Sequence, residues 1–317
     1  MSKLLKGIPA QHLSKLIKQI CLDAGFTKVG ISRANELIKE KEFLYKWLDE
    51  KRNADMEWLN KNVEKRCNPK LIQENTISVI SLAYLYDTPN SQTEDRNIPK
   101  ISRYAWGKRD YHKVIKKKLK SICTEIMRIS PEIDTRFYVD DGPVMDKAWA
   151  VKSGIGWMGK HTNVINPDIG SYFFLSEILI NCELEYGKPI EDLCESCNIC
   201  VNACPTGAIY DDYKLDSNLC ISYQTIENKG EIPESLNLYG WIFGCDICQD
   251  VCPFNQEKTF TNDKNFFPRL DILNKTFDEL LEISEEDFNK TFSSTSIKRA
   301  KYKGWLRNLS KAKQEIN

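Results

Sequence analysis

The stretch CESCNICVNACPTGAI, residues 194–209, decides how the rest of the chain is interpreted. Its cysteines follow the pattern C-x2-C-x2-C-x3-C-P, which is typical of bacterial ferredoxins with two iron–sulfur clusters. They are Cys194, Cys197, Cys200 and Cys204. A second group, closed by Pro253, consists of Cys220, Cys245, Cys248 and Cys252. Eight thiolates match two 4Fe–4S clusters with four ligands each.

The spacing also predicts which cysteines share a cluster. Three cysteines of one short loop reach one cube, and the fourth then reaches the other cluster. We therefore predict cluster-1 cysteines Cys194, Cys197, Cys200 and Cys252. The predicted cluster-2 cysteines are Cys204, Cys220, Cys245 and Cys248. A pair of zinc sites is the alternative, but zinc normally uses two separated cysteine pairs and rarely a compact run closed by proline.

The composition is ordinary for a globular protein of about two domains. Of 317 residues, 41% are hydrophobic, and 45 basic residues balance 45 acidic ones, so net charge alone predicts no polyanionic partner. The N-terminus, MSKLLKGIPAQHL, lacks the long apolar core of a secretory signal. The apolar stretch ISVISLAYLY (77–86) is too short to span a membrane. We therefore expect a cytoplasmic protein, with its cysteines reduced or bound to metal.

Hydrophobic periodicity divides the chain into three segments. Residues 1–186 predict an α+β domain of α/β type, residues 187–258 a ferredoxin-like module in which metal replaces a hydrophobic core, and residues 259–317 a polar helical segment. Helices are expected over 11–25, 35–60, 111–130 and 143–154, and strands over 26–32, 77–86, 135–140 and 171–181. Pro143 suits a first helical position. Thr276 and Ser284 each fit the start of a capping box.

Two short motifs in the first segment point toward a ligand. GIGWMG (154–159) matches the dinucleotide fingerprint, but it follows a helical stretch instead of a strand, which argues against a Rossmann site. Its glycines more simply allow close approach of the backbone to a large ligand or a tight turn. Asp140 and Asp141 end the strand-like FYVD. A turn and helix cap explain Asp141, whereas Asp140 could project into a pocket and hold a proton beside an apolar ligand.

The C-terminal stretch SIKRAKYKGWLRNLSKAK (296–313) has seven basic residues, no acidic residue and two interleaved aromatic ones. Cations for phosphates and aromatic faces for bases are the ingredients of RNA binding. The alternative is a solvated basic helix anchored by Ile297, Trp305 and Leu309. The locally basic end on a neutral protein favours nucleic acid.

Together these stretches resemble the epoxyqueuosine reductase family, over about residues 9–312. The motifs that carry the resemblance are EKRCNP (64–69), SRYAWGKRDYH (102–112), VDDGPVMDKA (139–148), SGIGWMGKHT (153–162), NPDIGSYFFLSEIL (166–179), CISYQT (220–225), GCDICQDVCPFN (244–255) and IKRAKYKGWLRN (297–308). The resemblance implies a cobalamin-binding domain docked on a two-cluster ferredoxin module. The clusters would pass electrons to cobalt, and the epoxide of epoxyqueuosine at the tRNA wobble position would become the alkene of queuosine.

The resemblance also implies residue roles and partners. Asp140 would be the proton donor, and cobalamin contacts would be Arg66, Ser102, Asp140, Val164, Leu175 and Ser222. Contacts to tRNA would be Lys298, Arg299, Lys301, Lys303 and Arg307. The expected partners are tRNAs with GUN anticodons and a low-potential electron donor such as ferredoxin or flavodoxin, and we expect a monomer.

Three other functions remain possible on the sequence. A reductive dehalogenase would use the same cofactors on organohalides, but such enzymes usually carry a twin-arginine signal that is missing here. A pure electron-transfer protein would not bind a corrin. An RNA-binding protein with structural clusters would bind tRNA without converting it.

Overall fold

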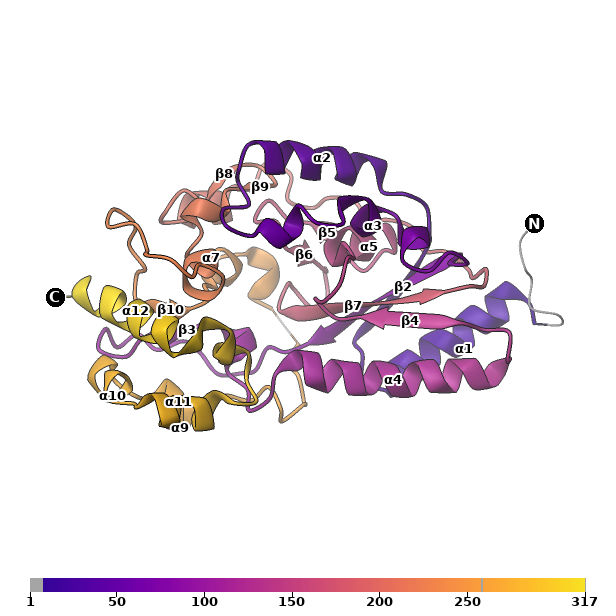
Figure 1. Cartoon of the computed structure of the whole chain (residues 1–317). Coiled ribbons are helices and arrows are strands. Elements are labelled where there is room, and N and C mark those ends of the chain that lie inside the picture. Colours follow the sequence, from indigo (N-terminus) through magenta and orange to yellow (C-terminus); the bar gives the residue numbers. More distant parts are fainter. Residues whose placement is uncertain (1–7, 258, 317) are drawn as a thin grey trace.

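The computed structural model describes residues 8–257 and 259–316. A four-stranded antiparallel sheet, in the order β1-β2-β7-β4, forms the centre of the N-terminal half (Figure 1). The strands are β1 (Lys28–Arg33), β2 (Ser78–Leu85), β3 (Lys100–Ile101), β4 (Thr135–Tyr138), β5 (Trp157–Met158), β6 (Val164–Ile165), β7 (Phe173–Ile180), β8 (Ile209–Asp211), β9 (Lys214–Leu215) and β10 (Trp241–Phe243). The helices are α1 (Ala10–Asp23), α2 (Ile38–Asp49), α3 (Val63–Cys67), α4 (Tyr111–Ile129), α5 (Asp146–Lys152), α6 (Ile199–Ala203), α7 (Ile221–Ile226), α8 (Ile247–Asp250), α9 (Leu270–Leu273), α10 (Phe277–Leu281), α11 (Glu285–Phe292) and α12 (Lys301–Gln314).

Helices cover both faces of the sheet. Because side chains alternate along a strand, Ile178 and Ile180 of β7 enter the core beneath α1 and α4, while Leu179 enters the core with α2, α3 and α5 (Figure 1). Both long central strands are almost fully buried. The predicted α+β organisation of this half is therefore confirmed.

The C-terminal helices share a core with part of the cysteine-rich segment. Trp305 of α12, completely buried, packs in one cluster with Trp241 of β10, Ile221 of α7 and Phe288 of α11. Apolar side chains, and not metal alone, therefore stabilise residues 221–243. The capping box at Thr276 is complete, and at Ser284 the hydroxyl accepts the Asp287 backbone N–H.

Three predicted boundaries are wrong for local reasons. The helix expected over 35–60 ends at Asp49, because Lys51 and Ala54 adopt positive φ in a turn that contacts residues 210–217. The helix expected from Pro143 begins only at Asp146. Gly142, with φ +96°, reverses the chain over the Tyr138 ring, and the strand expected to reach Asp140 ends at Tyr138.

Among the described residues, no helix is both long enough and apolar enough to cross a membrane.

Candidate active site

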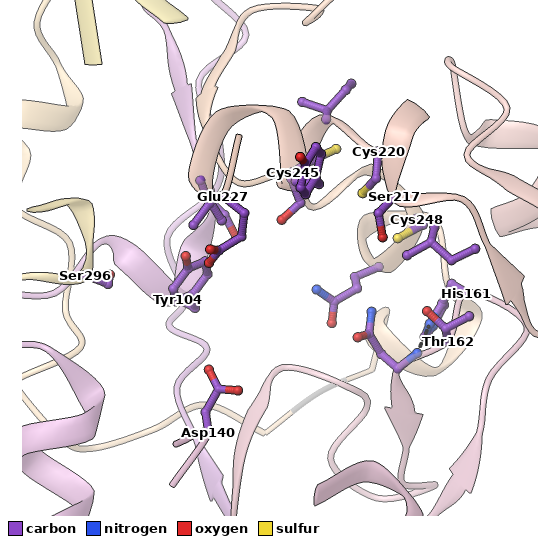
Figure 2. Close-up of a pocket in the computed structure, with 18 of the residues that line it drawn as sticks. Tyr104, Asp140, His161, Thr162, Ser217, Cys220, Glu227, Cys245, Cys248 and Ser296 are labelled. Atoms are coloured by element: carbon purple, nitrogen blue, oxygen red, sulfur yellow. Dashed lines mark hydrogen bonds between the residues drawn. The ribbon is translucent and has the colours of Figure 1, made fainter. Parts of the chain in front are cut away.

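A cavity of about 890 Å³ lies where the three segments meet. Its wall is formed by the ends of β6 and β7, the loop after β4, α7 with the cysteine loops, and residues 293–299. Figure 2 shows Asp140 facing the open space across from Cys220, Cys245 and Cys248, with Glu227 and Tyr104 between them on one side. The cavity thus has Asp140 on one wall and four cysteines on another.

The cluster-2 cysteines all line this cavity. Burial raises the pKa of Cys248, and the charges of Cys220 and Cys204 raise it further. Burial likewise raises the pKa of Cys245, with added effects of Cys248 and Cys220. Because neighbouring thiols raise one another's pKa and all four line the same cavity, the four side chains lie near one another. An iron–sulfur cluster fits this arrangement, because bound iron keeps thiols deprotonated despite burial.

The cluster-1 cysteines gather behind the cavity wall. Burial, together with the charges of Cys194, Cys200 and Cys197, raises the pKa of Cys252 to about 11. Trp157 packs on Cys252, and its indole N–H lies 3.4 Å from Cys194 Sγ. The charge of Cys200 also raises the pKa of Cys248, so the two groups of cysteines are neighbours. Within residues 8–257 and 259–316, no group of three or more Cys, His, Asp or Glu side chains is arranged closely enough to hold a metal ion, so the division of the cysteines into these two ligand sets stays a prediction.

Asp140 occupies a turn between β4 and α5 with φ 45°. Its side chain is 66% exposed. The Tyr111 hydroxyl donates a hydrogen bond to Oδ2, and His112 Nε2 lies 4.0 Å from the same oxygen. Tyr111 and His112 come from the start of α4, whose N-cap is Asp110. No pattern in the residues alone singles out Tyr111 or His112.

His112 is held between carboxylates. Its Nδ1 lies 2.8 Å from Asp110 Oδ1. Burial lowers the pKa of His112, but the hydrogen bond to Asp110 and the charges of Asp110, Asp140 and Asp141 more than offset this, so the pKa is raised above its usual value. The carboxylates around His112 therefore favour its protonated form more than water would.

Two carboxyl groups, one fully buried and one partly buried, lie beside the Asp140 turn. Glu177 of β7 is fully buried, and Asp146 is the first residue of α5. Burial and the neighbouring charge of Asp146 raise the pKa of Glu177 well above its usual range. Lys147, on the cavity wall, donates to the Thr162 carbonyl and to Asn163.

Five of the six predicted cobalamin contacts line the cavity: Ser102, Asp140, Val164, Leu175 and Ser222. Arg66 does not. Its guanidinium lies over the Trp58 ring at 5.1 Å and donates to the Gly142 and Trp58 carbonyls. Since Trp58 itself lines the cavity, Arg66 supports the wall from behind.

The glycines of GIGWMG do not form a Rossmann turn. They follow α5 and lead into β5, whose partner β6 carries the cavity residue Val164. A Cβ on Gly156 would lie 2.0 Å from the Ile165 carbonyl oxygen, and one on Gly159 would lie 2.5 Å from Ile165 Cδ1. Glycine is required because the backbone packs directly on β6. The neighbouring His161 is buried, and its Nε2 has no hydrogen-bond partner within residues 8–257 and 259–316.

A polar network lies behind Ser102 and was not predicted. The Ser102 hydroxyl donates to Asp246 Oδ1, and the Arg103 backbone N–H donates to Asp246 Oδ2 at 2.8 Å. The Arg103 guanidinium lies 3.2 Å from Asp250. Burial raises the pKa of Asp246 to about 7. No sequence pattern pairs residue 102 with residue 246.

The predicted tRNA contacts divide into two sets. Lys298 and Arg299 line the cavity, and Arg299 forms an ion pair with Glu227. Lys301, Lys303 and Arg307 line a separate groove of about 560 Å³ on α12, together with Lys229 and Lys311.

Arg307 is already engaged within the protein. Its guanidinium donates to the carbonyls of Gln224 at 2.7 Å, Asn228 at 3.0 Å and Gly230. This arginine therefore holds the loop after α7 against α12.

Comparisons with known proteins agree with this architecture. A family model described as a 4Fe-4S double cluster binding domain matches residues 193–255, and one described as Epoxyqueuosine reductase QueG, DUF1730, matches residues 66–141. Residues 193–255 are therefore a double 4Fe–4S cluster domain, and the zinc alternative is set aside.

Relatives cover almost the whole chain. The epoxyqueuosine reductase of Cellulophaga algicola is 43% identical over 298 residues, which is 93% of this chain and 96% of the relative. That of Escherichia coli is 37% identical over 307 residues, 95% of this chain and 80% of the relative. A crystal structure of epoxyqueuosine reductase with a tRNA-Tyr epoxyqueuosine-modified stem loop has a TM-score of 0.89 and 30% identity, covering 96% of this chain and 81% of that one. The chain belongs to the epoxyqueuosine reductase family.

Proposed function

We propose that this protein reduces epoxyqueuosine in tRNA to queuosine, with cobalamin bound in the cavity between Asp140 and the cluster-2 cysteines. The single observation that carries the proposal is this cavity. It places thiolates suited to an electron-carrying cluster opposite a carboxyl group at a distance that a large ligand can bridge.

The residues of the wall fit a corrin. Val164, Leu175 and Phe173 offer an apolar surface to a flat ring, while Ser102 and Ser222 supply hydroxyls for its amide side chains. The unpartnered Nε2 of His161 adds a polar group that a ligand can satisfy. Bound cobalamin would supply a cobalt centre that accepts electrons from the clusters and gives two electrons to the epoxide.

The chain's own residues would manage the protons. Conversion of the epoxide to an alkene and water consumes two electrons and two protons. Asp140 would give the first proton to the epoxide oxygen, with Tyr111 holding its carboxyl group in place. His112, whose Nε2 lies 4.0 Å from Asp140 Oδ2, would then return a proton to Asp140 for the second transfer.

The positions of the two cysteine groups suggest the direction of electron flow. Cluster-2 cysteines line the cavity, whereas cluster-1 cysteines do not, and Cys194 and Cys197 are partly exposed. We therefore assign electron uptake from a ferredoxin or flavodoxin to cluster 1 and delivery to cluster 2.

The tRNA would lie over the mouth of the cavity. Lys298 and Arg299 line the cavity, and Lys301, Lys303 and Lys311 line the adjoining groove, so their charges can hold the backbone phosphates of an anticodon arm. Arg299 would exchange its partner Glu227 for a phosphate.

Mass analysis of nucleosides tests the proposal. Anaerobically purified protein with both clusters is given cobalamin, a strong reductant and tRNA that contains epoxyqueuosine. Loss of one oxygen from that nucleoside, only when cobalamin is present, is expected. Protein that holds the clusters and cobalamin but leaves the nucleoside unchanged would contradict the substrate. Failure to bind cobalamin would instead favour a pure electron carrier.

A further inference from the structure

We propose that Asp246 is a positioning residue that couples the cavity wall at Ser102 to the cluster-2 cysteine loop. Asp246 itself does not line the cavity and touches no reacting atom, so its effect would pass through its neighbours. The proposal rests on the proposed cobalamin site, because it concerns how the wall of that site is tied to its source of electrons.

The two backbone segments are joined before any side chain is considered. Strand β3 pairs in parallel with β10, and the Ser102 N–H donates to the Phe243 carbonyl at 2.8 Å. Gly244 has φ +72°, and a Cβ at this position would lie 2.5 Å from Ser102 Cβ. Any other residue would push Ser102 away from the loop that begins with Cys245.

The Asp246 side chain then fixes the position of the cysteine loop relative to residues 102–103. It lies between Cys245 and Cys248 in sequence and is completely buried. One carboxylate oxygen accepts the Ser102 hydroxyl, and the other accepts the Arg103 N–H. A buried carboxylate with only these partners would be costly if either were lost, so the cysteine loop and residues 102–103 are expected to move together.

A second set of contacts holds helix α8 to the cavity wall. Arg103 is only 9% exposed and binds Asp250 at the end of α8, while the Tyr172 hydroxyl donates to the same Asp250 at 2.6 Å. On the cavity side, the Ser171 hydroxyl donates to Gln249 at 2.8 Å. Helix α8, which carries Cys248, is thus held to the cavity wall along its length. Partners that orient metal ligands influence both the potential and the affinity of a metal site.

The diagnostic variant is Ser102→Ala, which removes one hydroxyl without changing any charge. Midpoint potentials of both clusters are measured by redox titration with EPR detection, in protein without cobalamin or tRNA. Ser102→Ala and Asp246→Asn are expected to shift the potential of the same single cluster. The matched control is Ser296→Ala, which also lines the cavity but lies away from Cys220 and Cys248 (Figure 2), and it should leave both potentials unchanged.

Cobalamin affinity supplies the second readout. Asp246→Asn should weaken binding roughly 10-fold, the effect expected when one buried hydrogen bond to a carboxylate is lost. The double variant should be no weaker than the stronger single variant, because both changes break one coupled unit. Unchanged potentials in Ser102→Ala, or effects on affinity that add in the double variant, would overturn the proposal. If Asp246→Asn fails to retain iron, Ser102→Ala alone decides. Since the potentials need neither cobalamin nor tRNA, failure of the proposed function would be recognised separately.

Discussion

Asp140 combines a positive φ with an exposed carboxyl group held by Tyr111. Asparagine tolerates positive φ and can still accept the Tyr111 hydrogen bond, so Asp140→Asn removes the ionisable carboxyl group without removing the geometry. We expect this variant to retain both clusters and cobalamin, and its single-turnover rate to fall roughly 10²- to 10⁴-fold, as measured by nucleoside mass analysis.

Asp141→Asn is the matched control. The Asp141 carboxylate accepts the Val139 N–H and pairs with Lys116, so it stabilises the same turn without facing the ligand. Turnover in this variant should stay close to that of the unaltered protein. A rate close to normal in Asp140→Asn would remove Asp140 from the chemistry.

His161 makes stability depend on pH. Burial and the charge of Lys147 lower its pKa to about 4, so the folded protein keeps this imidazole neutral while the unfolded chain protonates it near pH 6.5. Stability is therefore unaffected above pH 6.5 and is lost as pH falls toward 4. Between pH 7 and 5 the loss from this residue is about 2 kcal/mol.

Urea denaturation of the unaltered protein and of His161→Gln at both pH values measures this effect. The variant should lose about 2 kcal/mol less than the unaltered protein over the same interval. An identical pH dependence in the two proteins would show that His161 is not the responsible group.

At the scale of elements, the sequence predicts what is locally encoded and misses what depends on packing. The uninterrupted apolar runs of β2 and β7 are enough to predict buried strands, and the cysteine spacing is enough to predict a domain with two 4Fe–4S clusters. The start of α5 was misplaced because the Tyr138 ring and Gly142, and not Pro143, shape that turn. Asp246 and His161 gain their importance from contacts with distant residues, which no local pattern contains.

Helix α12 allows the structural and RNA-binding uses of basic residues to be separated. Arg307 donates to three backbone carbonyls, so Arg307→Met should lower the free energy of unfolding by about 2 kcal/mol. Lys303 is exposed on the groove, and Lys303→Met should leave stability within about 0.5 kcal/mol of normal.

The same two variants differ in tRNA binding. Loss of one phosphate contact in Lys303→Met should reduce the slope of log affinity against log salt concentration by about 1. Denaturation and salt-dependent binding measured side by side test both predictions. A normal salt slope in Lys303→Met would remove this residue from the tRNA surface.

For the whole molecule, the clusters join parts of the chain that are far apart in sequence. Each predicted ligand set takes cysteines from both the 194–204 loop and the 245–252 loop. The sheet β1-β2-β7-β4 has its own cores, and the C-terminal helices have another. The cluster loops lie between these bodies, where Cys194, Cys252 and Phe254 join a small apolar cluster around Trp157 and Cys245 packs against the edge of the C-terminal core. Their stability should therefore depend on iron.

Removal of iron with a chelator under anaerobic reducing conditions should loosen only these loops. We expect hydrogen exchange to rise over residues 187–220 and 244–257, while the buried strands β2 and β7 keep their protection, because metal binding supplies folding free energy where a core is lacking. Cobalamin affinity should fall in the same sample, since Cys220, Cys245 and Cys248 form one wall of its proposed cavity. Protein treated with reductant alone is the control. If exchange in β2 and β7 rises equally, the sheet and the cluster loops form one cooperative unit. If the loops stay protected, their packing suffices without metal.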